Sequence, residues 1–211
     1  MVRTPMVRRL VMTAAAAIVS MGLLVAADAG VSVAKGPAKA KGIANCHIAS
    51  GTGNLNPGLT PAGSAGGVKI NFSAVLDKQC GNSSITKPKG DTIVGGTVTG
   101  SGFYKTGFGS SCANFDGPDV VGTITVTVKW ATSGAPIANT TIVYKNNPAT
   151  TSGSPTDTIT LLAPPGTATK TGSFMAPATN DTTSLTTDLP APPCGPGPFS
   201  TFNILGGNVL V

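Results

Sequence analysis

Few side chains in this sequence are suited to catalysis, because the chain has one histidine and no glutamate. A serine hydrolase would need His47 as its base, yet no serine lies in the G-x-S-x-G context that exposes a nucleophile. Paired carboxylates hydrolyse glycosides, and the nearest pair is Asp116 and Asp119. Aspartate beside Gly117 and Pro118 is the ordinary composition of a turn. We therefore expect no catalytic residues, and we interpret His47 as a surface or strand-edge residue.

The same residues offer little to a metal or a cofactor. Calcium accepts aspartate and carbonyl oxygens, but the two carboxylates of Asp116 and Asp119 are too few for a strong site. The four cysteines are widely spaced, and none is in a C-x-x-C pair. His47 directly follows Cys46, which is not a ligand spacing typical of zinc sites. The sequence thus predicts neither a metal site nor a cofactor.

The four cysteines are better explained as disulfides, because their number is even and the N-terminal residues described in the next paragraph predict export. Four cysteines allow three connectivities, and their positions alone do not choose among them. A topological argument favours Cys46–Cys80 and Cys112–Cys194. Cys46 begins one predicted strand and Cys80 ends the next, so an antiparallel pair of these strands brings the two residues together.

The export signal occupies the N-terminus. Three arginines precede an apolar run from Leu10 to Ala27, and small residues follow, which is the layout of a secretory signal peptide. Cleavage after Ala29 or after Ala34 fits the small-x-small rule, and we favour residues 1–29 as the signal. The alternative is an uncleaved anchor, since the run approaches the length that spans a bilayer. We expect a secreted or cell-envelope protein whose only membrane contact is this segment before cleavage.

Composition separates the remaining chain into a tail and a body. Residues 30–211 carry eleven Lys, seven Asp and no Arg, a net charge of +4. Three of the lysines lie in the Gly- and Ala-rich residues 30–42, which we predict to be a flexible tail. The body is therefore nearly neutral, and without arginine it has no basic face for nucleic acid.

Residues 43–211 form one predicted all-β domain, since Thr and Val favour strands while Gly and Pro mark turns. Alternation is clearest in residues 68–76 and 124–130, where Val, Ile, Phe, Ala, Leu and Trp fall on one face. Other strands are predicted at 43–52, 93–99 with a bulge at Gly95-Gly96, 137–144, 158–162, 169–174 and 201–211, with a loop at 54–67. The pattern favours an antiparallel β-sandwich or a partly open barrel with two disulfides.

The Gly-rich stretch from Gly100 to Pro118 carries the aromatic residues most available to a ligand. Phe103, Tyr104, Lys105 and Phe108 form a possible ligand loop for a glycan or a partner protein. The alternative is that these rings fold back as a lid over the body. Trp130 lies on the apolar face of the strongest predicted strand, which indicates a core position.

The order of these features resembles a group of uncharacterised secreted proteins from actinobacteria. The resemblance rests on Cys46, on Cys80, on Ser111-Cys112, on the run from Gly122 to Trp130 and on Cys194-Gly195. It implies export and a disulfide-bridged β fold, and it brings no activity with it. In a bacterial source the N-x-S/T sequons at Asn71, Asn82, Asn139 and Asn180 are incidental, because such sites matter in a eukaryotic secretory pathway.

Three functions remain in order of expectation. The first is an exported, non-enzymatic β domain with a structural or adhesive role at the cell envelope or outside the cell. The second is a ligand-binding module for a glycan or a lipid. The third is a secreted hydrolase that uses His47 or the aspartates. The partner is unknown, with cell-envelope components as the candidates.

Overall fold

The computed structural model describes the chain in nine stretches. These are residues 36–61, 66–81, 92–105, 121–145, 148–151, 157–163, 169–175, 181–188 and 198–211. The predicted signal peptide, Asp116, Asp119, Phe108, Cys112 and Cys194 lie outside them. None of the nine stretches contains a helix long and apolar enough to cross a membrane.

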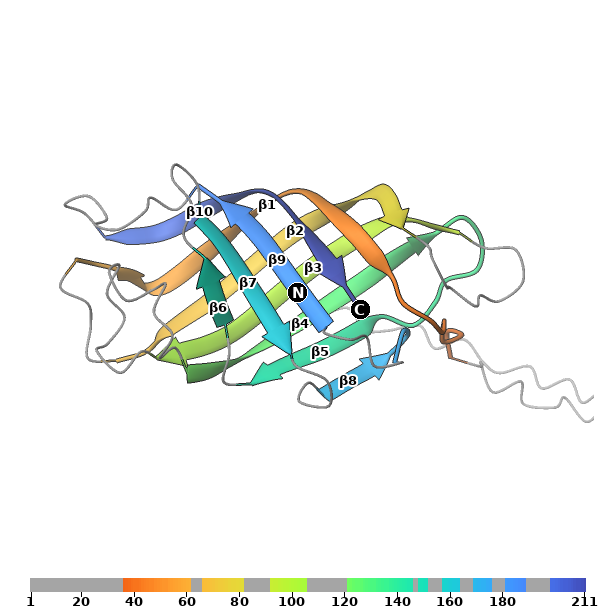
Figure 1. The fold of residues 1–211 in the computed structure, drawn as a ribbon, viewed down its shortest axis with the longest axis horizontal. Helices are drawn as coiled ribbons and strands as arrows, with labels where there is room; N and C mark the ends of the chain where they lie inside the picture. The colour runs from red at the N-terminus through yellow and green to blue at the C-terminus, as the bar shows by residue number, and fades with distance from the viewer. Residues whose placement is uncertain are drawn as a thin grey trace, which may run out of the picture. The chain divides into compact units, whose positions relative to one another are not determined.

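The described residues form ten strands of one continuous sheet (Figure 1). The strands are β1 (Asn45–Leu59), β2 (Val68–Gly81), β3 (Ile93–Lys105), β4 (Val121–Thr132), β5 (Thr140–Lys145), β6 (Pro148–Thr151), β7 (Asp157–Ala163), β8 (Thr169–Gly172), β9 (Asp181–Thr187) and β10 (Phe199–Leu210). Their order in the sheet is β6-β7-β9-β10-β1-β2-β3-β4-β5-β8. Every ladder between them is antiparallel, so the prediction of an all-β antiparallel body is confirmed.

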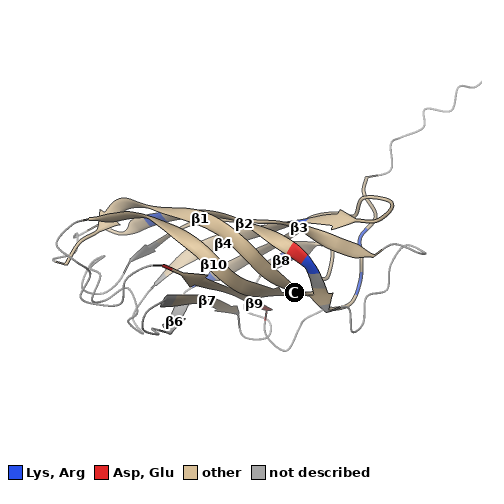
Figure 2. Ribbon diagram, turned by 90° about the horizontal axis from the view of Figure 1, so that it is seen from above, with Lys and Arg blue, Asp and Glu red and all other residues tan. Residues whose placement is uncertain are grey.

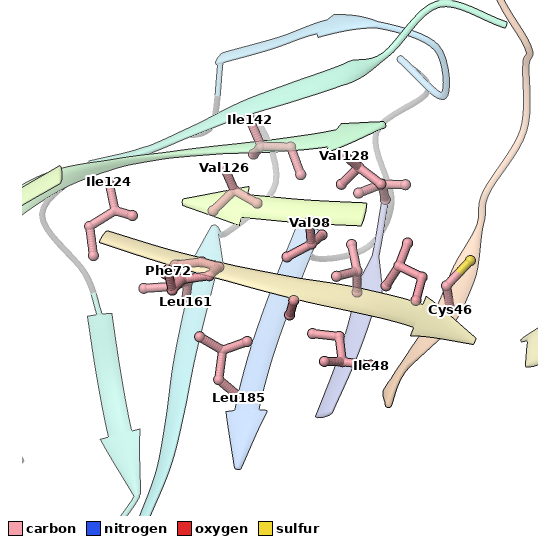
Figure 3. Close-up of a cluster of buried hydrophobic side chains, with 14 of the residues drawn as sticks. Cys46, Ile48, Phe72, Val98, Ile124, Val126, Val128, Ile142, Leu161 and Leu185 are labelled. Carbon is pink, nitrogen blue, oxygen red and sulfur yellow. The ribbon is translucent and has the colours of Figure 1, made fainter. Parts of the chain in front are cut away.

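The inner face of the sheet carries the apolar half of the alternation. The predicted inward positions of β2 and β4 are all buried, and Trp130 is 6% exposed. Figure 3 shows side chains from several strands meeting in this core, among them Phe72, Val126 and Leu185. Because successive residues of a strand point to opposite faces, the polar half of the pattern is left on the outer face.

The sheet curls into a half-barrel, so that its two ends approach each other. In Figure 1 β7 and β9 cross in front of β4, and β7 contacts β5 although these two strands share no ladder. Tyr144 on β5 shares a 3.0 Å hydrogen bond with the Thr183 hydroxyl on β9. Lys170 on β8 lies 2.7 Å from Asp181 on β9, and both side chains are almost fully buried. The architecture is one curved sheet, and the finer expectation of two stacked sheets is not seen in the described residues.

The described part of the predicted tail has defined partners in the body. The carbonyl of Ala38 accepts a hydrogen bond from the Ala138 amide, and the carbonyl of Ala40 accepts one from Phe174. The Ala40 amide donates to the Ser173 hydroxyl, and the Ala40 side chain is buried. Ala44 exchanges two backbone hydrogen bonds with Val211. Residues 36–44 thus connect the segments that follow β4, β8 and β10.

Two features of the strand pattern differ from the sequence prediction. β1 continues to Leu59, through part of the predicted loop at 54–67, because its backbone goes on pairing with β2 as far as Asn56 and Lys69. β6 and β9 are additional strands, which the sequence does not predict, on either side of the predicted strands at 158–162 and 169–174. The predicted bulge at Gly95-Gly96 is confirmed by a register shift between β3 and β4.

Candidate functional site

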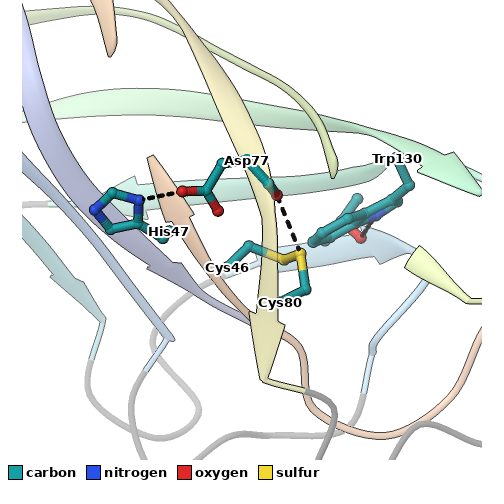
Figure 4. The surroundings of a disulfide bond; sticks show 6 residues. Cys46, His47, Asp77, Cys80 and Trp130 are labelled. Atoms are coloured by element: carbon teal, nitrogen blue, oxygen red, sulfur yellow. Dashed lines mark hydrogen bonds and ion pairs between the residues drawn. A yellow bond between two sulfur atoms is a disulfide. The ribbon is translucent and has the colours of Figure 1, made fainter. Parts of the chain in front are cut away.

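The only histidine is paired with an aspartate on the outer face. His47 on β1 and Asp77 on β2 meet with 2.6 Å between Nδ1 and Oδ2 (Figure 4). The His47 side chain is 45% exposed and that of Asp77 is 27% exposed. An aspartate that holds Nδ1 of a partly exposed histidine is two thirds of a hydrolase triad.

The third member of such a triad is missing from the described residues. None of their hydroxyl groups hydrogen-bonds to His47. The nearest serine in the same cross-strand register is Ser184, which is reached through Asn208 on β10. Two strand spacings separate it from His47, roughly 10 Å, whereas a nucleophile must lie within hydrogen-bond distance of its base. The pair is therefore a surface interaction in this part of the chain.

The disulfide predicted from topology is present. Cys46 and Cys80 are register partners on β1 and β2 and are joined through their sulfur atoms. Cys46 is fully buried and Cys80 partly buried against the core. A disulfide fits a protein that folds in an oxidising compartment. The predicted partners Cys112 and Cys194 lie outside the described residues.

The possible ligand loop is divided between a strand and an undescribed stretch. Phe103, Tyr104 and Lys105 belong to β3, so these three positions are not in a loop. The Phe103 side chain is 47% exposed, and its ring lies against Gly67. Phe108 and the side chains of Tyr104 and Lys105 fall outside the description. The described residues also hold no group of three His, Cys, Asp or Glu side chains arranged for a metal ion.

A polar groove lies on the outer face, where β2, β1 and β10 run side by side. Its volume is about 570 Å³. The residues that line it are Thr52, Gly53, Asn54, Asn71, Phe72, Ser73, Asp188, Thr201, Phe202 and Asn203. Gly53, Phe72 and Phe202 are buried on the inner face, so they present backbone to the groove. The side chains around it are therefore amides, hydroxyls and one carboxylate.

Hydrogen bonds hold two pairs of these side chains in place. The carboxylate of Asp188 accepts from the backbone N–H and from the Nδ2 of Asn203, each at 2.6 Å. The Asp188 amide in turn donates to the Asn203 carbonyl at 3.1 Å. Across the groove, Nδ2 of Asn71 donates to Oδ1 of Asn54 at 3.2 Å. The groove is thus a pre-organised array of donors and acceptors.

The groove is one end of a longer polar surface, which we call the hydroxyl row. Its members are register partners on seven strands, and all are at least partly exposed. They are Asn203, Thr52, Ser73, Thr99, Thr127, Thr141 and Thr171. Figure 2 shows how few charged positions the described strands carry. This surface can form many hydrogen bonds while presenting little charge.

The alternation in residues 68–76 predicts that Asn71 and Ser73 lie on the polar face of β2, but it does not predict the groove. Asn54 falls in the predicted loop at 54–67, and no local pattern predicts that β10, with Asn203, lies between β1 and the β9 segment that ends at Asp188. Comparison of the chain with protein-family models, with curated proteins and with solved structures finds no match.

Proposed function

We propose that this protein is an exported, non-enzymatic β domain with a structural or adhesive role at the cell envelope or outside the cell. The observation that carries the proposal is the hydroxyl row, an uncharged hydrogen-bonding surface that crosses seven strands. A surface of this kind suits adhesion to polar, hydrated material through many weak contacts. Such contacts add up when the partner is a repeating polymer or an extended matrix.

Export is supported by the Cys46–Cys80 disulfide together with the predicted leader. The predicted body has no basic face that would draw the protein to the envelope by charge. Export by the predicted leader is therefore the simpler explanation. If the intact chain were found in the cytosol with its thiols reduced, export would be refuted.

A non-enzymatic role is supported by the chemistry around His47. Its partner Asp77 is present, but Ser184 lies two strands away. The hydrolase alternative predicts that His47→Ala abolishes a measurable activity. The proposal predicts that His47→Ala leaves envelope binding unchanged.

The proposal is tested by sedimentation of the purified, oxidised chain with insoluble envelope material from its source. We expect the protein to co-sediment, and we expect binding to persist when NaCl rises from about 0.05 to about 0.5 M, because salt screens charge contacts more than neutral hydrogen bonds. Failure to co-sediment, or release by salt, would contradict an adhesive role through this face.

A matched pair of variants on β3 shows whether the hydroxyl row makes the contact. Thr99→Lys places a charged, bulky side chain inside the row, whereas Val94→Lys places the same side chain on the same strand outside it. Both parent side chains are exposed. We expect at least a fivefold loss of binding for Thr99→Lys and little change for Val94→Lys. An equal effect of the two variants would contradict a role for the row.

A further inference from the structure

We infer that the groove formed by β2, β1 and β10 is a binding site for an uncharged carbohydrate chain. This inference rests on the proposed function and names the ligand class for one part of the hydroxyl row. It follows from three properties of the groove: the groups that line it, the hydrogen-bonding capacity they retain, and its position in the middle of the sheet.

The lining selects a polar, neutral ligand. Only one of its ten residues is charged, and that residue is Asp188. A carboxylate opposes phosphate or other anionic ligands, and the described residues that line the groove include no lysine to offset it. The large apolar residues Phe72 and Phe202 are buried on the inner face, so a lipid chain would meet amides and hydroxyls instead of apolar surface. One carboxylate is also too few for a calcium site.

The side chains retain donors and acceptors after their mutual hydrogen bonds are counted. An asparagine amide has two donor hydrogens and an acceptor oxygen. The Asn71–Asn54 bond uses one hydrogen of Asn71 and one lone pair of Asn54. It leaves the amino group of Asn54 and the carbonyl oxygen of Asn71 able to bind a ligand. Asn203 likewise keeps its side-chain oxygen after its Nδ2 has donated to Asp188.

These remaining groups match the hydroxyls of a sugar. Each sugar hydroxyl both donates and accepts, and neighbouring hydroxyls on a ring form a pair that a planar amide can contact together. Because Asp188 and Asn203 are fixed to each other, and Asn54 to Asn71, little side-chain freedom is lost on binding. The groove therefore suits hydrogen-bonded recognition of a polyhydroxylated ligand.

The position of the groove argues against an extended peptide as its occupant. Peptides that bind sheets add a strand to an open edge, where unpaired backbone groups are available. Here β1 is paired on both sides, with β10 and with β2. At the groove, Thr52, Gly53 and Asn54 have register partners on both neighbouring strands, so a ligand in the groove must be recognised by side chains.

Phe72 and Phe202 keep their rings on the inner face, so the described residues offer the groove no aromatic platform, and a single sugar is expected to bind weakly. Binding should become strong only for a polymer, where many sugar units present the same hydroxyls and a released unit is quickly replaced by its neighbour. This makes a soluble polysaccharide the right probe.

The test is native gel electrophoresis of the oxidised full chain through gels that contain dextran, mannan or galactan, with dextran sulfate as an anionic comparison. The protein is produced in a bacterial export host, because Asn71 is part of an N-x-S sequon and a eukaryotic host would modify the groove itself. We expect at least one neutral polysaccharide to retard the protein, and dextran sulfate to have a weaker effect.

The variant Asn54→Thr/Asn71→Thr removes both amides and keeps residues that favour strands. We expect its retardation to fall at least fivefold. Asn45→Thr is the matched control, since Asn45 is exposed on the same face of β1 and lies outside the groove. Urea unfolding midpoints of all three proteins show whether the variants remain folded.

The outcomes separate this inference from the proposed function. Loss of retardation in the double variant alone supports a carbohydrate site in the groove. Equal retardation of all three proteins overturns the groove as the site. Sedimentation with envelope material without retardation by any neutral polysaccharide overturns the ligand class and leaves the adhesive function standing. Failure of both experiments overturns both proposals.

Discussion

Gly53 and Gly100 are placed where aromatic rings cross the inner face of the sheet. In register order the residues are Phe202, Gly53, Phe72 and Gly100, so phenylalanine alternates with glycine on four neighbouring strands. The ring of Phe202 lies over Gly53, and the ring of Phe72 lies over Gly100. Because glycine has no side chain, the ring can pack directly on its backbone. This packing offsets the destabilising effect of a glycine inside a strand.

Gly53→Ala should therefore lower stability, because the new methyl group would occupy the space of the Phe202 ring. Overpacking of this kind costs about 1–3 kcal/mol. Gly206→Ala is the control, since its methyl group would meet only the Ile48 carbonyl at 3.7 Å, and we expect a change within about 0.5 kcal/mol. Urea unfolding measures both, and similar midpoints for the two variants would contradict the packing described.

The buried phenol of Tyr144 makes the stability of the fold depend on pH in alkaline solution. Burial raises the pKa of its phenol above the ordinary value, while the hydrogen bond with Thr183 opposes the shift. The folded state therefore keeps this proton more tightly than the unfolded chain, whose tyrosine pKa is about 10. The corresponding stability is complete below pH about 10 and is lost as the pH rises toward the folded-state value.

Tyr144→Phe removes the ionisable proton and therefore removes this part of the loss of stability at alkaline pH. Between pH about 10 and 12 we expect the unfolding free energy of the wild type to fall more steeply, by up to about 1.4 kcal/mol per pH unit relative to the variant. Urea titrations at several pH values measure the two slopes. Parallel slopes would show that the phenol is not shielded from solvent.

At the scale of the elements, the ion pair between β8 and β9 joins the two ends of the curved sheet. Nζ of Lys170 and Oδ1 of Asp181 are 2.7 Å apart, with side-chain exposures of 6% and 11%. β8 is the strand at one end of the sheet order, whereas β9 lies near the other. The pair therefore acts between elements that share no backbone ladder in the described sheet.

Lys170→Met should cost about 3–5 kcal/mol, because it leaves the Asp181 carboxylate buried without its main partner. The double variant Lys170→Met/Asp181→Leu should be more stable than the single one, since no buried charge remains. Lys145→Met on neighbouring β5 is the control, as Lys145 is exposed. Urea midpoints decide the order, and a double variant less stable than Lys170→Met would contradict the argument.

The strands that sequence predicted well are those with apolar residues at every second position. In β2 and β4 the inward residues are aliphatic or aromatic, so the period of two was visible. In β9 the inward residues are Asp181, Thr183, Leu185 and Thr187, and only one of them is apolar. Two of the polar inward residues have partners across the half-barrel, since Tyr144 bonds to Thr183 and Lys170 to Asp181. That arrangement depends on the tertiary curl, which no local pattern encodes.

The groove could not be predicted from the sequence, because it also depends on how distant strands pair. Asn54 and Asn71 lie on consecutive strands, but Asn203 comes from the last strand and joins them only because β1 lies between β2 and β10. The alternation in β2 placed Asn71 on the polar face correctly. The pairing of β1 with the last strand was not predicted, so the groove was not either.

At the scale of the whole molecule, the Cys46–Cys80 bridge ties the central strands together. The two residues are separated by 34 positions and pair β1 with β2 near the middle of the sheet order. Their pairing was deduced from topology because consecutive antiparallel strands bring the start of one beside the end of the other. The bridge therefore restricts the unfolded chain between β1 and β2, the two strands that form a central ladder of the sheet.

The double variant Cys46→Ala/Cys80→Ala should be less stable than the wild type by about 3 to 4 kcal/mol, since the unfolded chain regains the entropy of a loop of that length. Removing both cysteines together avoids an unpaired thiol that would exchange with the remaining Cys112 and Cys194. Urea unfolding under non-reducing conditions measures the difference. A peptide map without reductant gives the direct check, because it must contain a fragment that links Cys46 to Cys80. A fragment that links either residue to Cys112 or Cys194 instead would refute the β1–β2 register from which the groove and the hydroxyl row are built.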